Sequence, residues 1–600
     1  MSATFLHFFV IFISLCILST LIYVSRKRPY FGLNGAAWNN NENLKFSILT
    51  RKTEFGEIAT QGNYRNQGDA YRSKATEPIK KADIVSLSSL IMQEFNLSFK
   101  SKDKRILGGK WLDIFPEVRH MLQEIETGRP ASSINGITSA KQSVVTFDKK
   151  RKYFEGNTWK GLIKSYDRKN NLKSQGGDYY KASLYRSERI IDGGVSCTVK
   201  DNQNGTYGVE CPLPWQGRGF VRVFLQSPKE TVYLNMLITS KMNEELIIKN
   251  TSFINSFKQR EYSICDMDLR DKYNDSDICD HSNLRNGEPW FCVKTSSGEC
   301  PAIENQLEKI VDKDGGKAFR RNRYRVEPAA VGSGDPVAFS IRKRPVKMKR
   351  KLETCSKKNL HQCTWISKSH WMVPKVDLGH HFNVCSENLV TLRFVQCMKN
   401  KKIYVVGDSV ASQWFRFMYG ISRSTGKLFS RFGWSEPQNT FSKIHNITLH
   451  YRGHGPPLHG PGPPLFHPYI SNTIDSIKHA GRETHFLVSF GPHFGGYHPD
   501  VFLNRLVKIK KAMLRLLSRS PDVTFYIAGI IPHSPWEVQP SEWIMYRQEI
   551  LMRSVLGNMK GVIYLQFWDM ASVIMNKKVH VLNDLLRQQM RIFNSYLCSP

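Results

Sequence analysis

The chain has 600 residues, which is more than a single hydrophobic core organises, so at least two domains are expected. Its formal net charge is +34, which implies affinity for polyanions, either nucleic acids or acidic glycans and membrane surfaces. No zinc-finger spacing, RNA-binding signature or basic zipper accompanies this charge. A nucleic-acid partner is therefore disfavoured.

Residues 4–24 are almost wholly apolar and long enough to cross a membrane, either as a signal-anchor or as a cleaved signal peptide. No small-x-small cleavage site is obvious, which favours an anchor. Three basic residues at 26–28 would place the flanking chain in the cytoplasm. Against this, eleven of the twelve cysteines follow the segment, mostly in close pairs typical of an oxidising compartment.

We give the cysteines more weight and place the body of the protein in the secretory pathway. It would be luminal on an ER or Golgi membrane, with the membrane contact made by residues 1–25, or secreted. Sequons support this assignment as candidate glycosylation sites. They lie at Asn96, Asn204, Asn250, Asn274 and Asn446.

Residues 26–142 are polar and broken, and we expect a stem with little core. From 143 to 301 short alternating stretches are separated by Gly, Asn and Asp, a pattern that predicts an antiparallel sandwich. The expected strands are 143–147, 159–166, 179–185, 206–210, 220–225 and 231–238. A hairpin turn is expected at 202–205.

The cysteines beyond the apolar segment fall into three groups of disulfide candidates. Cys197 and Cys211 flank the predicted hairpin turn and would bridge two neighbouring strands. The second group, whose spacing is not that of a zinc site, is Cys265, Cys279, Cys292 and Cys300. The last is Cys355, Cys363, Cys385, Cys397 and Cys598, in which one thiol would lack a partner.

Three stretches carry a resemblance to the neurexophilin-like domain: 175–180 (QGGDYY), 204–207 (NGTY) and 290–301, from WFCV to the final CP. The resemblance implies an Ig-like β-sandwich over 143–301. The following residues, 302–352, are Gly-rich and then strongly basic, and we expect a linker. Its charge run 347–350 is either a solvated surface or a site of luminal proteolysis.

Residues 353–600 alternate strands with helices, which predicts an α/β domain with a mainly parallel sheet. Strands are expected at 403–406, 484–490, 523–531 and 562–567. Helices are expected from about 412, and at 501–518, 541–556 and 584–597. Catalytic groups in such a domain lie at the carboxyl ends of the strands.

Polar groups follow the expected strands in the order needed for acyl transfer. Gly407-Asp408-Ser409 follows the first strand, His493 the second and Asp569 the fourth, and His580 precedes the last helix. A serine on a sharp turn at the mouth of a helix exposes its hydroxyl, and a late histidine can take its proton. We expect Asp408 to be structural, through hydrogen bonds within the turn.

These residues resemble the PC-esterase branch of the SGNH (GDSL-like) hydrolases and acyltransferases. With the neurexophilin-like domain before it, the chain resembles the neurexophilin and PC-esterase (NXPE) family. The motifs are VGDS with QW at 406–414, YRGH at 451–454, SFGPHF at 489–494, LSRSP at 517–521, WDM at 568–570, VH at 579–580 and YLC at 596–598. The resemblance implies a three-layer SGNH-type domain.

The resemblance also implies roles for single residues. Ser409 would be the nucleophile and His580 the general base. The oxyanion would be bound by the backbone N–H of Ser409, by Gly453 or His454, and by His493, which stands where many SGNH enzymes have asparagine.

The triad carboxylate departs from the SGNH pattern. Its usual position, three residues before the histidine, is Lys577 here. Asp569 is the nearest upstream candidate, and its alternative role is to cap a turn or helix. Asp584 is interpreted as stabilising the amino end of the last helix.

Several further histidines invite a metal interpretation, but their segment is Gly/Pro-rich without helical or strand spacing. We expect a flexible substrate loop and no metal. These residues are His445, His450, His454, His459 and His467.

The resulting hypothesis is a secretory-pathway glycoprotein that transfers or removes O-acetyl groups on carbohydrate, sialic acid included, through a serine acyl-enzyme. No cofactor is expected to be bound, and acetyl-CoA would be the donor if the protein is a transferase. A glycan or glycoprotein is the expected substrate, and the sequence gives no oligomeric state. The alternative is a ligand or glycan-binding protein with a degenerate esterase domain.

Overall fold

The computed structural model divides the chain into two compact units, Met1–Thr76 and Glu77–Pro600, and every residue described below belongs to the second. The structure describes, with a few single-residue gaps, 134–149, 151–188, 194–232, 248–309, 328–343, 353–354 and 385–386. In the C-terminal region it describes 394–426, 436–456, 468–532, 542–573 and 580–598.

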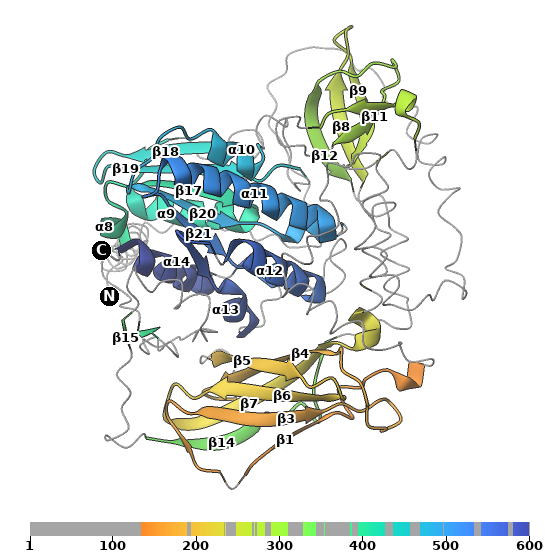
Figure 1. Cartoon of the computed structure of the whole chain (residues 1–600), viewed down its shortest axis with the longest axis vertical. Coiled ribbons are helices and arrows are strands. Elements are labelled where there is room, and N and C mark those ends of the chain that lie inside the picture. Colours follow the sequence, from red (N-terminus) through yellow and green to blue (C-terminus); the bar gives the residue numbers. More distant parts are fainter. Residues whose placement is uncertain are drawn as a thin grey trace, which may run out of the picture. The chain divides into compact units, whose positions relative to one another are not determined.

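The first domain is a β-structure of nine strands whose order is β1-β3-β6-β5-β4-β7-β14-β2, with β13 paired to β7 (Figure 1). Strand β5 pairs with β4 through residues 194–197 and with β6 through 198–201, so it passes from one half of the structure to the other. Both halves enclose one core, in which Trp159, Tyr207 and Leu225 are buried. The strands are β1 (Val144–Phe147), β2 (Tyr153–Phe154), β3 (Thr158–Lys164), β4 (Tyr179–Tyr185), β5 (Gly194–Asp201), β6 (Thr206–Pro212), β7 (Gly217–Ser227), β13 (Ala329–Ala330) and β14 (Val337–Arg342).

This domain is discontinuous in sequence, which corrects the expected linker at 302–352. Strand β14 pairs with β7 and buries Ile341 in the core, although basic residues follow it directly. The apolar positions of this strand are few, and the charge run beside them concealed the alternation. At the other end Ile137 and Ala140 are also buried, so the ordered domain begins before residue 143.

One expected strand of this domain is wrong. Residues 229–232 are helical, whereas a strand was expected at 231–238. The carbonyl of Pro228 accepts hydrogen bonds from the amides of Thr231 and Val232, which closes a helical turn. Proline fixes the φ angle that starts such a turn.

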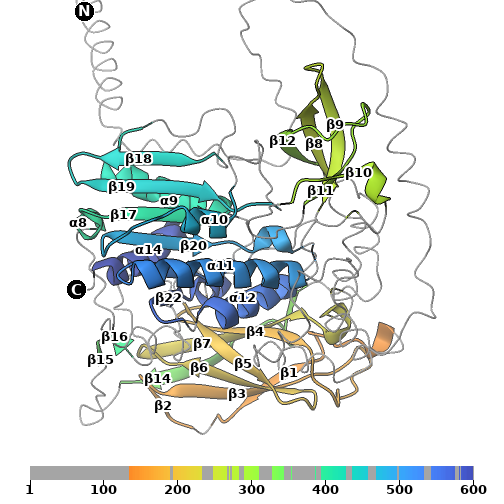
Figure 2. The same ribbon diagram turned by 45° about the horizontal axis from the view of Figure 1, so that its top comes forward.

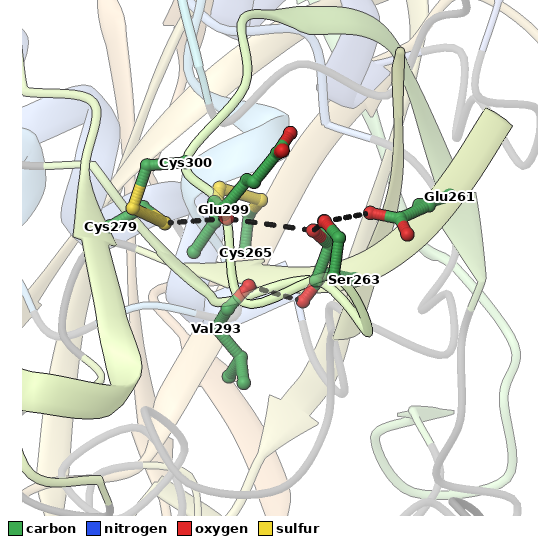
Figure 3. Close-up of a disulfide and its surroundings, with 10 residues drawn as sticks. Glu261, Ser263, Cys265, Cys279, Val293, Glu299 and Cys300 are labelled. Atoms are coloured by element: carbon green, nitrogen blue, oxygen red, sulfur yellow. Dashed lines mark hydrogen bonds between the residues drawn. A yellow bond between two sulfur atoms is a disulfide. The ribbon is translucent and has the colours of Figure 1, made fainter. Parts of the chain in front are cut away.

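A separate five-stranded sheet is inserted between β7 and β13, in the order β10-β11-β9-β8-β12. Its strands, which were expected to be part of the sandwich or linker, form their own small structure because two disulfides replace a large core. Cys265 pairs with Cys292 and Cys279 with Cys300. Figure 3 shows the second bond, with the Ser263 hydroxyl directed at the Val293 carbonyl. The strands are β8 (Ile248–Ile254), β9 (Arg260–Asp266), β10 (Ile278–Asp280), β11 (Phe291–Val293) and β12 (Ile303–Lys309).

The predicted bridge between neighbouring strands is confirmed, because Cys197 of β5 is bonded to Cys211 of β6. A fourth disulfide joins Cys397 to Cys598 across 201 residues of sequence. Cys385 opens the short strand β16 (Cys385–Ser386), paired with β15 (Glu353–Thr354), but its side chain lies outside the described residues, as do Cys355 and Cys363. These disulfides fit an oxidising secretory or extracellular environment.

The C-terminal domain contains a six-stranded sheet of order β18-β19-β17-β20-β21-β22, in which only β18 runs antiparallel to its neighbour. One core lies against α10, α11 and α12, and a second lies against α8, α9 and α14 on the other face of the sheet. Figure 2 shows α11 and α12 side by side. The strands are β17 (Lys402–Gly407), β18 (Gln438–Ser442), β19 (Ile447–Gly453), β20 (Thr484–Ser489), β21 (Thr524–Ala528) and β22 (Val562–Leu565). The helices are α8 (Phe394–Met398), α9 (Ser409–Ser422), α10 (Ile470–Asp475), α11 (Pro499–Arg519), α12 (Glu542–Leu556), α13 (Phe567–Val573) and α14 (Asn583–Cys598).

The expected loop around the extra histidines is partly wrong, because 447–453 form strand β19. Ile447, Leu449 and Tyr451 alternate as fully buried residues, while the residues between them are less buried. This is the period-two pattern of a strand. The Gly/Pro-rich composition that follows, from 455 to 464, obscured it.

Side chains of β4 contact the C-terminal domain. Tyr185 donates a hydrogen bond to the carbonyl of Val573 at 2.8 Å, and both residues are fully buried. Lys181 pairs with Glu542 at 2.8 Å. The sandwich is thus joined to α12 and α13 by buried polar contacts.

Among the described residues no helix is long and apolar enough to span a membrane, and the apolar segment 4–24 lies outside them. Three sequon asparagines, Asn204, Asn274 and Asn446, are exposed. Asn250 lies on β8 without a described side chain, and Asn96 is outside the described residues.

Candidate functional site

The turn after β17 is held by a close approach of two backbones. Gly407 has φ +155°, and a Cβ there would collide with the carbonyl oxygen of Ser489 on β20. Only glycine fits such an approach. The next amide, that of Asp408, donates to the same carbonyl at 3.3 Å. The nucleophile candidate therefore leaves the sheet at a fixed point between β17 and β20.

Asp408 caps helix α9. Its buried carboxylate accepts hydrogen bonds from the amides of Val410 at 2.9 Å and Ala411 at 3.4 Å, and its carbonyl accepts from Ser412 at 3.1 Å. Burial raises the pKa of this carboxyl to about 6. A cap of this kind contributes about 1 kcal/mol to stability. Its role is therefore structural.

The cap has a consequence for Ser409, the first residue of α9. Three of the first four helix amides are occupied, and within the described residues the Ser409 amide has no recorded acceptor. The Ser409 side chain is partly exposed. A half-exposed hydroxyl beside an amide at the positive end of a helix suits a nucleophile with an oxyanion donor.

Two histidines meet across the end of β17. His454 follows β19 and His493 lies in the short 3-10 helix η10 (Pro492–Phe494) after β20, the two neighbours of β17. Nε2 of His454 lies 2.8 Å from Nδ1 of His493, and the backbone amide of His454 donates to the Gly407 carbonyl at 3.0 Å. The pair therefore lies directly over the residue that begins the Gly407-Asp408-Ser409 turn.

The partners of His454 decide where the protons of this pair lie. Nδ1 of His454 is 2.8 Å from the carbonyl oxygen of Gly455, which can only accept, so this nitrogen carries a proton. In the neutral pair Nε2 of His454 is then bare, and Nδ1 of His493 donates to it. Nε2 of neutral His493 consequently carries no proton and can only accept.

This proton order bears on the expected oxyanion donors. Neutral His493 cannot donate from Nε2, and the backbone amide of His454 is already bonded to Gly407. Gly453 is the last residue of β19 and is buried opposite Gly407. The Ser409 amide is therefore the best-placed donor of the predicted set.

A buried arginine holds the loop that carries His454. Arg505 of α11 is 1% exposed and donates to the carbonyls of Pro456 at 2.6 Å and Gly455 at 3.5 Å. Its guanidinium lies 4.5 Å from the ring centre of Tyr469 and 5.3 Å from that of Phe494. Sequence analysis missed this role, because an arginine on an amphipathic helix is usually solvated.

His580 is linked to the nucleophile helix through its neighbour. The side chain of Gln413 donates to the carbonyl of Val581 at 3.3 Å and accepts from its amide at 3.1 Å. Gln413 lies one turn after Ser409 on α9, so the two share a helix face. This amide clamp brings the residue before Val581 toward Ser409, and the Gln-Trp motif at 413–414 was its only sequence signal.

The electrostatics of His580 differ from those of a triad histidine. Its side chain is exposed, yet the surrounding protein removes part of its hydration, which lowers its pKa. Repulsion from Arg416 of α9 lowers the pKa further, and no described carboxylate contributes. A lowered pKa keeps the base neutral at pH 7 but does not stabilise the imidazolium formed on proton transfer.

Asp569 lies in the first turn of α13. Its charge acts on Arg553 of α12 and on Tyr179 of β4, raising the pKa of both groups. Within the described residues no hydrogen bond or ion pair joins Asp569 to His580. Lys577 lies outside the described residues, and Asp584 is the second residue of α14. The structure thus gathers Ser409, His454 and His493, with His580 tied in through Val581, and leaves Asp569 with other partners.

The remaining histidines do not form a metal centre in the part of the chain that the structure describes. His450 of β19 is bonded to Asn439 at 2.8 Å and stacks on Tyr404, and burial lowers its pKa to about 4. His445 lies in the turn between β18 and β19, whereas His459 and His467 are outside the described residues.

Comparison with known proteins identifies the C-terminal domain. Residues 380–598 match the family described as "NXPE family member 4-like, C-terminal domain". Among solved structures, the Lin-41 filamin domain aligns with 14% of this chain and 80% of its own chain, at 16% identity and a TM-score of 0.13. A likeness with so low a score carries no argument.

Proposed function

We propose, from the premise that residues 380–598 belong to the NXPE family, that this domain transfers or removes O-acyl groups through an acyl-enzyme on Ser409. The observation that carries the proposal is the geometry of Ser409. Its hydroxyl and a helix amide without a recorded acceptor lie together at a strand end, beside two histidine groups. An SGNH-type three-layer arrangement is part of the proposal.

The chemistry follows from these groups. His580 takes the Ser409 proton while Oγ attacks the acyl carbonyl carbon, and the negative charge on the carbonyl oxygen is bound by the Ser409 amide. Collapse of the tetrahedral intermediate expels the donor's leaving group and leaves the acyl group on Oγ. Attack by a sugar hydroxyl gives transfer, and attack by water gives hydrolysis.

The substrate class rests on two weaker supports. The net charge of +34 suits an anionic glycan. The NXPE resemblance implies an O-acetyl group on carbohydrate, sialic acid included, with acetyl-CoA as donor if the reaction is transfer. Three exposed sequons and four disulfides favour a secretory protein that meets glycans or glycoproteins.

The second candidate function is glycan binding without catalysis. It is favoured by one observation: no described carboxylate acts on His580, whose pKa is lowered instead by lost hydration and Arg416. A domain that had lost its triad carboxylate could retain the pocket as a lectin-like site.

The test is to incubate the full glycosylated chain with acetyl-CoA and a sialylated glycan, or with an O-acetylated glycan, and follow acetylation by mass spectrometry. We expect a change in acetylation that the Ser409→Ala variant does not produce, and an acetyl adduct on the peptide holding Ser409. Glycan binding with no change in acetylation and no adduct would leave the binding function in its place.

A further inference from the structure

We propose that His493 is a second general base of this site, which takes the proton of the hydroxyl that receives the acyl group, and that His454 is its positioning residue. This inference rests on the proposed function. It concerns the second half of the reaction, for which the resemblance assigns His580 again.

The position of the pair supports the assignment. β19 and β20 flank β17 on opposite sides, and the residues that follow them meet at 2.8 Å across its end. The His454 ring packs near Phe490 and Phe494, which belong to the core facing α11. Val581, the neighbour of His580, belongs to the core facing α9 and α14. The two histidine groups therefore approach the Ser409 turn from opposite faces of the sheet.

The resting state of the pair suits a base. His454 is fully buried and His493 is 6% exposed, so a net charge on the pair is disfavoured by lost hydration. Arg505 donates to the same Gly455 carbonyl that fixes His454, and its fixed positive charge disfavours a further proton. The other described charge at this strand end, Asp408, is turned into the amides of α9. The neutral pair presents the bare Nε2 of His493 as an acceptor.

The carbonyl–His454–His493 series replaces the orienting part of a triad. In a triad a carboxylate bonded to Nδ1 selects the tautomer whose Nε2 is bare. Here the Gly455 carbonyl fixes His454, and the bare Nε2 of His454 then holds the Nδ1 proton of His493. The tautomer is selected without a carboxylate, and the imidazolium formed on His493 shares its proton with His454.

A second base is needed if the donor is a thioester. A thiolate leaves without a proton, so His580 keeps the Ser409 proton while the acyl-enzyme exists. The accepting hydroxyl then transfers its proton to Nε2 of His493 as its oxygen bonds to the acyl carbon. The bond to Oγ breaks, Oγ recovers its proton from His580, and His493 releases its proton to water. The sum is thioester plus alcohol giving ester, thiolate and a proton.

The test separates the two half-reactions with 4-nitrophenyl acetate, whose phenolate also leaves unprotonated. In a rapid-mixing assay the burst reports acylation of Ser409, and decay of the acyl-enzyme with and without a sugar acceptor reports deacylation. We expect His493→Gln to keep the burst rate within a few-fold and to slow transfer by about 100-fold to 10,000-fold. Equal losses in both steps, or no loss in either, would overturn the assignment.

His454 is tested by rescue. His454→Phe should slow transfer as His493→Gln does, because Nδ1 of His493 loses its acceptor, whereas His454→Gln offers an amide oxygen and should recover much of the rate. His450→Gln, on the same strand but bonded to Asn439, is the matched control and should behave as the wild type. Loss of transfer in the control, or no difference between Phe and Gln, would contradict a positioning role.

A measurement without catalysis keeps the proton order testable. In the protein labelled with ¹⁵N-histidine, the His493 signals assigned through His493→Gln should show protonated Nδ1 and bare Nε2 at pH 7.5. A protonated Nε2 would overturn the proposal. If the wild type shows no burst, the proposed acyl-enzyme fails and the base role with it, while the nitrogen signals still decide the state of the pair.

Discussion

The two histidine groups beside Ser409 are held in opposite ways. The His454–His493 pair is buried, and each ring is bonded to a partner that fixes its tautomer. His580 is exposed, has an arginine as its only charged influence, and is placed through the backbone of Val581. Burial with bonding defines a protonation state, whereas a backbone clamp defines only a position. The site therefore combines one rigid proton acceptor with one that responds to its surroundings.

The largest effect is expected at the residue that both groups serve. Ser409→Ala should lower O-acyl activity by about 10,000-fold or more, since no other described hydroxyl occupies this turn. Thermal unfolding should be little changed, because the side chain is partly exposed and Asp408 provides the cap. Ser412→Ala, one turn along α9, is the control. Equal activity of the two variants would show that Ser409 is not the nucleophile.

His580→Ala should lower acylation by about 100-fold to 10,000-fold, the usual range for loss of a general base. The pH profile carries the sharper test. Only neutral His580 can accept a proton, and its pKa lies below the ordinary 6.5, so acylation should fall only at pH values below that. The profile is measured from burst rates between pH 4.5 and 8.

Arg416→Gln is the matched variant for that profile. Removing the guanidinium removes a repulsion, so the pKa of His580 should rise and the acid limb should move toward pH 6.5. An unmoved limb would mean that the titrating group is not His580.

Gln413→Leu should lower acylation by about 10-fold, because the side chain that bonds both backbone groups of Val581 is lost while His580 itself remains. The burst rate measures the effect, and transfer at saturating acceptor should change less. A larger fall in transfer than in acylation would place the clamp with the other histidine group.

The smallest effect is expected for Asp569→Asn. Its charge acts on Arg553 and Tyr179, so we expect less than about a five-fold loss of activity and a modest fall in melting temperature. A triad carboxylate would instead cost on the order of 10,000-fold. A loss of that size would restore Asp569 to the catalytic group.

Sequence patterns predicted those parts of the fold in which one physical signal dominates. Strand β17 and helix α11 have clear apolar periods, and the Cys197–Cys211 bridge follows from a hairpin turn. Strand β19 was missed because Gly/Pro-rich chain follows it, and β14 because basic residues follow it. Helix α9 begins at Ser409 and not near 412, since the Asp408 carboxylate starts it through the amides of Val410 and Ala411.

The candidate site was predictable only as residue types. The Gly-Asp-Ser turn and the late histidine have a recognisable order, and family membership of the C-terminal domain is confirmed. The proton order of the histidine pair depends on the Gly455 carbonyl, and backbone carbonyls have no sequence signature. Arg505 and Gln413 act on backbone groups distant in sequence, so neither role could be deduced from spacing.

The discontinuity of the sandwich sets an order for its assembly. β7 pairs with β4 on one side and with β14 on the other, but more than a hundred residues, including the whole inserted sheet, separate it from β14. During synthesis β7 must wait with an open edge, able to pair with other chains, until residue 342 has entered the compartment. A fragment ending at 301 would keep that edge permanently, so the sandwich should be expressed with its chain continued past β14.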